Sequence, residues 1–162
     1  MKKVGIVLIT LAMMASFTFA AKVATPKSID GIKGVVDADF VVKNIGKMKI
    51  YDVRKKAEYA DGSIFSATWV PYNEKSQKMV KFYADEVGKK EVAKWKKKNL
   101  PRFTKNKKEK IIVFCSGDYC WKSYKTAVLL VKQGYQNIYW YRGGFPDWSE
   151  HNLKDEDKYE IE

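Results

Sequence analysis

Short apolar runs divide the chain into strand-like segments. The run Ile111-Ile112-Val113-Phe114-Cys115 is apolar throughout, which is typical of a strand that is covered on both faces of a sheet. Further runs rich in β-branched and aromatic residues predict strands at 49–53, 67–70 and 137–141.

Helical spacing separates these strand-like runs. Ala127, Leu130 and Val131 stand at positions i, i+3 and i+4, and this spacing predicts a helix over about 121–133 that ends at Gly134. Shorter helices are predicted after the N-cap Asp37, at 57–60 and from Pro146. Strands that alternate with helices predict an α/β domain, with a central, mostly parallel sheet flanked by helices in three layers.

The first twenty residues have the pattern of a secretory signal peptide. Lys2 and Lys3 precede an uncharged, mostly apolar run that ends among small residues near Ala20. An uncleaved anchor is the alternative, but the run is just short of the roughly 17–25 residues that span a bilayer. We expect a signal peptide at 1–20, a lead-in at 21–35 and a single domain at 36–162, in a periplasmic or secreted protein.

Composition agrees with one packed domain and adds a strong positive charge. Of the 162 residues 46% are hydrophobic and 14% aromatic, which is enough to fill one core and argues against disorder. The formal net charge is +12, from 31 Lys and Arg against 19 Asp and Glu.

Most of this charge lies in a predicted lysine-rich insertion at about 76–110. Residues 89–110 contain eleven basic and two acidic residues, for a net charge of +9. Such a run is commonly a solvated surface, but it also attracts anions. Nucleic acid is a poor partner for an exported protein, so we expect an anionic small substrate, an anionic membrane surface or an acidic protein as the partner.

Two cysteines, Cys115 and Cys120, flank the loop between the clearest strand and the clearest helix. Disulfides persist outside the cytoplasm, but a bridge across so short a loop would stabilise the fold little. A cysteine at the end of the strand would face the amino end of the helix, where free N–H groups and the helix dipole favour a thiolate. This position predicts a nucleophilic Cys115, with a buried inert cysteine as the alternative.

The order of several motifs resembles that of the rhodanese-like family over nearly all of the predicted mature sequence. The family's first signature, D-x-R, E-Y, G-H-I, G-A and I-P, is similar to Asp52-Val53-Arg54, Glu58-Tyr59, Gly62-Ser63-Ile64, Ala67 and Val70-Pro71. The second half also matches, with a strand ending in Cys115, a helix from Ser123 to Gly134, a strand at 137–141, Gly143-Gly144 and Trp148.

The resemblance implies a sulfurtransferase without a cofactor. A loop cysteine would take sulfane sulfur from thiosulfate or polysulfide as a persulfide and pass it to a thiol or another acceptor. By position, Cys115 would carry the persulfide and Cys120 could resolve it, while Asp52 and Arg54 would hold the scaffold. The substrate-binding residues would be Ser116, Gly117, Asp118, Tyr119, Trp121, Lys122 and Ser123, with backbone N–H groups from 116 to 121 around the transferred sulfur.

Three features depart from the family's pattern. Six residues separate Cys115 from Lys122, where four are usual before an Arg-Ser pair, so a wider loop and a larger substrate are expected. Ser63 replaces a histidine, and the stretch between Pro71 and Ile111 is longer than usual. The Cys120-Trp121 pair also resembles a subgroup with a Cys-Trp motif that is associated with pyrroloquinoline-quinone-dependent oxidation.

Other functions fit parts of the pattern. Cys120 could attack a persulfide on Cys115 and leave a disulfide, which would make the protein a dithiol oxidoreductase. An inactive docking module is a further alternative, because Trp95 and the lysines could bind an acidic partner. A phosphatase is disfavoured because Trp121 stands where phosphate-binding loops place arginine. His151 and two cysteines do not supply the four ligands of a structural zinc site, so no metal is expected.

Overall fold

A five-stranded parallel sheet forms the centre of the molecule. The computed structural model describes residues 23–72 and 86–156. The sheet has the order β1-β5-β4-β2-β3, and each pair of neighbouring strands is parallel. The strands are β1 (Gly34–Val36), β2 (Lys49–Asp52), β3 (Thr68–Trp69), β4 (Lys110–Phe114) and β5 (Asn137–Tyr141).

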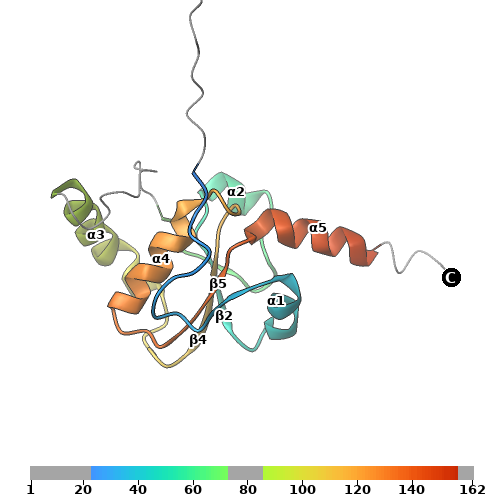
Figure 1. Cartoon of the computed structure of the whole chain (residues 1–162), viewed down its shortest axis with the longest axis horizontal. Coiled ribbons are helices and arrows are strands. Elements are labelled where there is room, and N and C mark those ends of the chain that lie inside the picture. Colours follow the sequence, from blue (N-terminus) through green and yellow to red (C-terminus); the bar gives the residue numbers. More distant parts are fainter. Residues whose placement is uncertain (1–22, 73–85, 157–162) are drawn as a thin grey trace, which may run out of the picture.

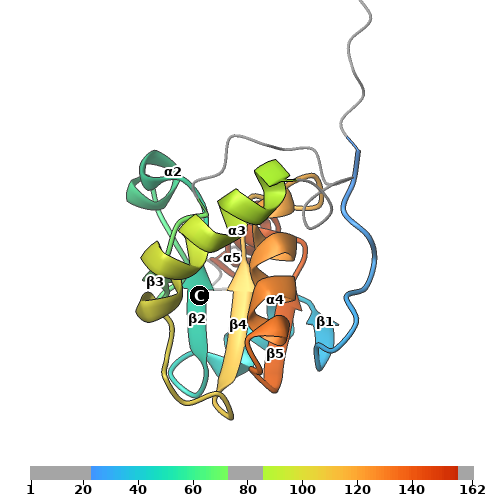
Figure 2. The ribbon, with the colours of Figure 1, turned by 90° about the vertical axis from the view of Figure 1, so that its left-hand side faces the viewer.

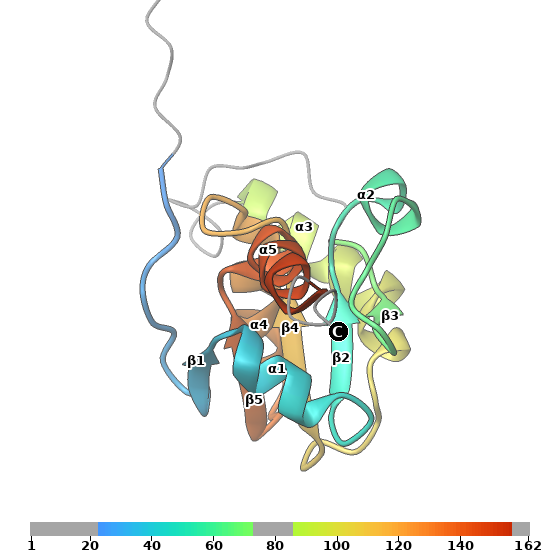
Figure 3. The same ribbon diagram turned by 90° about the vertical axis from the view of Figure 1, so that its right-hand side faces the viewer.

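Helices cover both faces of this sheet and complete three layers (Figure 1). α3 (Glu86–Lys98) and α4 (Trp121–Lys132) lie over one face (Figure 2). α1 (Ala38–Asn44) and α5 (Gly144–Glu156) lie over the other (Figure 3). The short helix α2 (Lys56–Ala60) follows β2, and the 3-10 turn η2 (Leu100–Arg102) follows α3. The predicted three-layer α/β architecture is therefore confirmed.

The alternation of side chains along β4 divides the core in two. Ile111, Val113 and Cys115 belong to the cluster beneath α3 and α4. Ile112 and Phe114 belong to the cluster beneath α1 and α5. Successive side chains of a strand point to opposite faces, so the central strand β4 supplies apolar groups to both layers.

The ends of the predicted helices agree with the structure, with one exception. Asp37 caps α1 by accepting a hydrogen bond from the Phe40 N–H at 2.9 Å. Gly134 adopts a positive φ of 85° just beyond α4, as a helix-ending glycine does. The last helix begins at Gly144, two residues before the predicted start at Pro146, because a proline is tolerated within a first helical turn.

The predicted lead-in contains a strand that the sequence pattern did not indicate. β1 pairs with β5, and Val35 lies opposite Trp140. The segment is only three residues long, which is too short for an alternating pattern to stand out. The predicted signal peptide at 1–20 lies outside the described residues.

The lysine-rich segment folds in part as α3. Val92 and Trp95 are buried against the core, and their spacing of three residues places them on one side of the helix. The lysines of 89–98 are exposed. Residues 76–85 of the predicted insertion lie outside the described part of the chain. In that described part no helix has both the length and the hydropathy needed to cross a bilayer.

Candidate active site

The loop between β4 and α4, residues 115–120, lies at the carboxyl ends of the parallel strands. It packs closely against the turn that leads into α5. The Phe145 N–H donates to the Cys115 carbonyl at 2.9 Å. A Cβ on Gly144 would lie 2.1 Å from the same carbonyl oxygen, and Gly144 also has a φ of +65°. Glycine is therefore required at this contact, which fixes the start of the cysteine loop.

Cys115 is buried in the core and does not present a thiolate. Its exposed fraction is 1%, because it continues the alternation of Ile111 and Val113 toward α4. Burial raises the pKa of the Cys115 thiol well above its ordinary value, and interaction with Cys120 raises it further. The low pKa predicted for Cys115 is contradicted. Its sulfur does reach the first turn of α4, where it lies 3.0 Å from Ser123 Oγ, but the effect of burial outweighs the hydrogen bonds from Ser123.

The thiol at the amino end of α4 is that of Cys120. Cys120 is the N-cap of this helix and is partly exposed. Its pKa is lowered to about 6, first by hydrogen bonding with the Cys115 thiol and then by the N–H groups of Ser116 and Lys122, against the opposing effect of burial. The Lys122 ammonium contributes in the same direction. Cys120 is therefore the more acidic of the two thiols.

This arrangement corrects the predicted cradle around Cys115. The N–H groups of Ser116 and Lys122 bond the Cys120 sulfur, whereas the Cys115 sulfur is bonded by the backbone and side chain of Ser123. The extra residues between Cys115 and Lys122 place Cys120 at the amino end of α4.

A chain of polar contacts connects the core to the two sulfurs. The Trp140 indole N–H donates to Ser123 Oγ at 2.9 Å, and Ser123 Oγ lies 3.0 Å from Cys115 Sγ. The Cys115 thiol has two acceptors in reach on residue 120, the carbonyl oxygen at 3.0 Å and the sulfur. The two cysteines are free thiols in direct contact.

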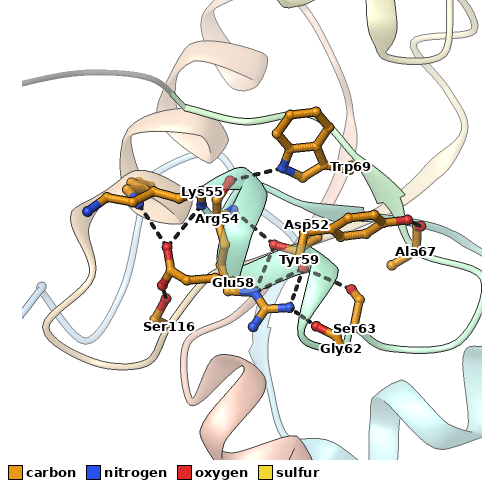
Figure 4. A network of polar contacts seen from close by, with 11 residues as sticks. Asp52, Arg54, Lys55, Glu58, Tyr59, Gly62, Ser63, Ala67, Trp69 and Ser116 are labelled. Carbon is orange, nitrogen blue, oxygen red and sulfur yellow. Dashed lines mark hydrogen bonds and ion pairs between the residues drawn. The ribbon is translucent and has the colours of Figure 1, made fainter.

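Glu58 on α2 holds the two ends of the cysteine loop. Its carboxylate accepts from Ser116 Oγ at 2.6 Å and lies 3.6 Å from the Lys122 ammonium. Burial alone would raise the pKa of Glu58, but hydrogen bonds from Ser116 and Lys55 and the nearby cations lower it. The carboxylate therefore stays ionised and restrains the predicted residues Ser116 (Figure 4) and Lys122.

Asp52 and Arg54 form a buried ion pair behind Glu58 (Figure 4). Arg54 Nη2 lies 2.7 Å from Asp52 Oδ2, with exposed fractions of 4% and 0%. Ser63 Oγ donates to Asp52 at 2.8 Å, and Arg54 also donates to the Gly62 carbonyl. Both charges are paired and hydrogen-bonded, as burial requires. The pair thus joins β2 to the loop after α2, in agreement with a scaffold role.

The lead-in crosses the outer side of the cysteine loop. The Thr25 N–H and hydroxyl both donate to the Asp118 carbonyl at 2.8 Å, and the Trp121 indole donates to the Val23 carbonyl at 3.0 Å. Arg142 donates to the Asp118 carboxylate at 2.6 Å and to the Thr25 carbonyl at 2.9 Å. Arg142 and Thr25 were not among the predicted site residues, although both hold Asp118.

The other predicted loop residues differ in exposure. Tyr119 is 59% exposed and stands beside Cys120 at the loop tip. Gly117 has a φ of +93° and packs against the Gly143 carbonyl. Over the described residues, no group of three or more His, Cys, Asp or Glu side chains could hold a metal ion.

A model of the rhodanese-like domain family matches residues 37–151. The chain belongs to the rhodanese-like domain family. Among the described elements, the match covers the helices α1 to α4, the first part of α5 and the strands β2 to β5, and it includes the cysteine loop. This family has a fold that supports sulfur transfer in general.

Solved structures agree on the fold. A rhodanese-related protein from Thermoplasma volcanium is 19% identical, with a TM-score of 0.50 and coverage of 72% of this chain and 91% of that one. An uncharacterized protein from Saccharomyces cerevisiae is 20% identical, with a TM-score of 0.52 and coverage of 75% and 95%. The reduced CoADR-RHD protein from Bacillus anthracis is 16% identical, with a TM-score of 0.53. The match covers 75% of this chain and 17% of that one. No curated protein matched the sequence.

Proposed function

We propose that this protein is a sulfurtransferase that carries sulfane sulfur on Cys120. The observation that supports this most is the partly exposed Cys120 sulfur at the amino end of α4, with a pKa lowered to about 6. A thiolate at such a position is a nucleophile at neutral pH. The family's general association with sulfur transfer supports the reaction class.

In the proposed reaction the Cys120 thiolate attacks the outer sulfur of thiosulfate. A Cys120–sulfur bond forms, the sulfur–sulfur bond of thiosulfate breaks, and sulfite leaves with the electron pair. The N–H groups of Ser116 and Lys122, which already stabilise the Cys120 anion, lie where they also favour the anionic persulfide. A thiol acceptor then removes the sulfur and restores the thiolate.

The charge of the molecule fits an anionic donor such as thiosulfate or polysulfide. The net charge is +12, and a positive field raises the encounter rate with anions. We infer a periplasmic or secreted location from the predicted signal peptide at 1–20.

Sulfur loading of single-cysteine variants tests this proposal. Cys115→Ser and Cys120→Ser are incubated separately with thiosulfate and with polysulfide, and intact masses are measured. We expect Cys115→Ser to gain about 32 Da, the mass of one sulfur, and Cys120→Ser to gain nothing. Loading of Cys120→Ser alone would return the carrier role to Cys115. No loading of either variant would favour the docking module in place of an enzyme.

A further inference from the structure

The site holds two cysteine sulfurs. Besides the proposed carrier Cys120, the sulfur of Cys115 lies in a position to react with a persulfide on Cys120. Cys115 Sγ lies 3.0 Å from the Cys120 carbonyl oxygen and within hydrogen-bonding reach of the Cys120 sulfur, and its exposed fraction is 1%. A buried thiol is shielded from external alkylating agents and oxidants. The group that can reach it is the one bonded to Cys120.

We propose that Cys115 resolves the persulfide on Cys120, so that the protein releases sulfide and becomes a Cys115–Cys120 disulfide. This inference rests on the proposed function, because it needs sulfur on Cys120. It adds a sulfide-releasing activity that a single-cysteine carrier lacks. It also reverses the roles expected from the sequence, in which Cys115 was the carrier and Cys120 the resolving cysteine.

The step balances in atoms and electrons. Cys115 Sγ attacks Cys120 Sγ, a bond forms between them, and the bond from Cys120 Sγ to the outer sulfur breaks. The Cys115 proton passes to the departing sulfur, which leaves as hydrosulfide. The sulfane sulfur gains two electrons and the two cysteines lose two. An external dithiol must then reduce the disulfide before the next cycle.

Geometry favours this attack over attack by a thiol from solution. Two sulfurs held in contact react as an intramolecular pair, with the orientation already fixed. Ser123 Oγ lies 3.0 Å from Cys115 Sγ, and its interaction with Ser123 opposes the effect of burial on the thiol. Ser123 is itself held by the Trp140 indole, so it acts as a positioning residue for the attacking sulfur.

The short separation of the cysteines fits a disulfide that cycles. Only four residues lie between Cys115 and Cys120, and a bridge that closes so small a loop gains little from restricting the unfolded chain. Disulfides of this kind are readily reduced by dithiols, in contrast to structural bridges.

The test compares full-length wild type with Cys115→Ser, using whichever of thiosulfate or polysulfide loads Cys115→Ser. Samples are freed of donor, quenched in acid and measured by intact mass, and released sulfide is assayed. We expect one sulfide per wild-type chain and a loss of about 2 Da, the mass of two hydrogens, while Cys115→Ser keeps its gain of about 32 Da. Dithiothreitol should return the wild type to its starting mass.

Two further variants separate resolution from folding. Cys115→Ala provides a second replacement if Cys115→Ser unfolds. Thermal unfolding shows whether each of the two variants is folded. Ser123→Ala should slow sulfide release by a larger factor than it slows loading. A wild type that keeps the added sulfur and releases no sulfide would overturn the resolving role alone. Failure of both donors to load Cys115→Ser or Cys115→Ala would overturn the proposed function as well.

Discussion

Two cysteines five positions apart acquire opposite properties from their surroundings. Cys115 follows the alternation of β4 into the core, where burial raises its pKa. Cys120 caps α4, where its pKa falls to about 6. The buried neutral thiol donates a hydrogen bond toward the exposed sulfur, so the first cysteine helps to make the second one reactive.

The sequence could have indicated this division of roles. Ile111, Val113 and Cys115 are alternate residues along β4, so their side chains point to the same face of the sheet. All three lie beneath α4. Our prediction used the position of Cys115 at the strand end but not the face of the sheet to which its side chain points, and so did not anticipate its burial. The presence of a reactive thiol in this loop was predictable, whereas its identity depended on how far the loop extends before α4 begins.

Removing the Cys115 thiol should raise the pKa of Cys120. Hydrogen bonding with Cys115 is the largest cause of the lowered value, and Cys115→Ala deletes the donor. The rate at which iodoacetamide alkylates Cys120 rises with its thiolate fraction. We therefore expect the midpoint of the pH–rate curve at about pH 6 in wild type and at a higher pH in the variant. Lys122→Met, which removes a smaller contribution, should shift the midpoint less. An unchanged midpoint in Cys115→Ala would mean that the two thiols do not interact.

At the scale of elements, the cysteine loop is held from three sides. The turn before α5 contacts the Cys115 carbonyl, α2 holds Ser116 and Lys122 through Glu58, and the lead-in binds Asp118. The last of these was not predictable, because Thr25 and Arg142 lie far apart in sequence and neither has a pattern that indicates the contact. The strands β2 to β5 and the helix α4 were predictable, since each carries a spacing of its own, whereas β1 is too short to show one.

The contact between Gly144 and the loop predicts a destabilising substitution. Gly144→Ala would place a Cβ 2.1 Å from the Cys115 carbonyl, so the loop must shift in addition to the strain at positive φ. Gly46→Ala is a matched control, because Gly46 has a φ of +75° and nothing within 4 Å of its Cβ. In urea unfolding, we expect Gly46→Ala to lose about 1–2 kcal/mol from strain alone and Gly144→Ala to lose more, about 3 kcal/mol or above.

The same pair of variants separates the loop from general stability. Gly144→Ala should also slow alkylation of Cys120 at neutral pH, since the N–H groups that lower its pKa would move. Gly46→Ala should leave that rate unchanged. Equal alkylation rates in the two variants would show that the turn before α5 does not set the geometry of the cysteine loop.

At the scale of the whole molecule, the parallel sheet gathers the functional loops at one edge, and much of the positive charge is concentrated in one segment of the chain. Residues 89–110, with their net charge of +9, include most of α3 and all of η2. Long-range fields of this kind act on charged reagents before any contact is made, and salt screens them. The fold class followed from the alternation of strands and helices, but the sequence alone did not place α3 beside α4.

This field predicts a preference for anionic reagents. Iodoacetate is negatively charged and iodoacetamide is neutral. The rate of reaction of Cys120 with iodoacetate, divided by its rate with iodoacetamide, therefore reports the local electrostatic potential. We expect the ratio to fall as salt rises from about 0.01 to 1 M, because the Debye length shrinks from about 30 to 3 Å. Lys94→Glu with Lys97→Glu, both exposed on α3, should lower the ratio at low salt. If neither salt nor the two lysine substitutions changed the ratio, the lysine-rich surface would not act on the site.

The central claim is that Cys120, and not Cys115, is the reactive thiolate. The most direct measurement is brief labelling of reduced, folded wild type with iodoacetamide at neutral pH, followed by mass mapping of the labelled cysteine. The account predicts label on Cys120 and none on Cys115, with both labelled after denaturation. Label that appears first on Cys115 in the folded protein would contradict it.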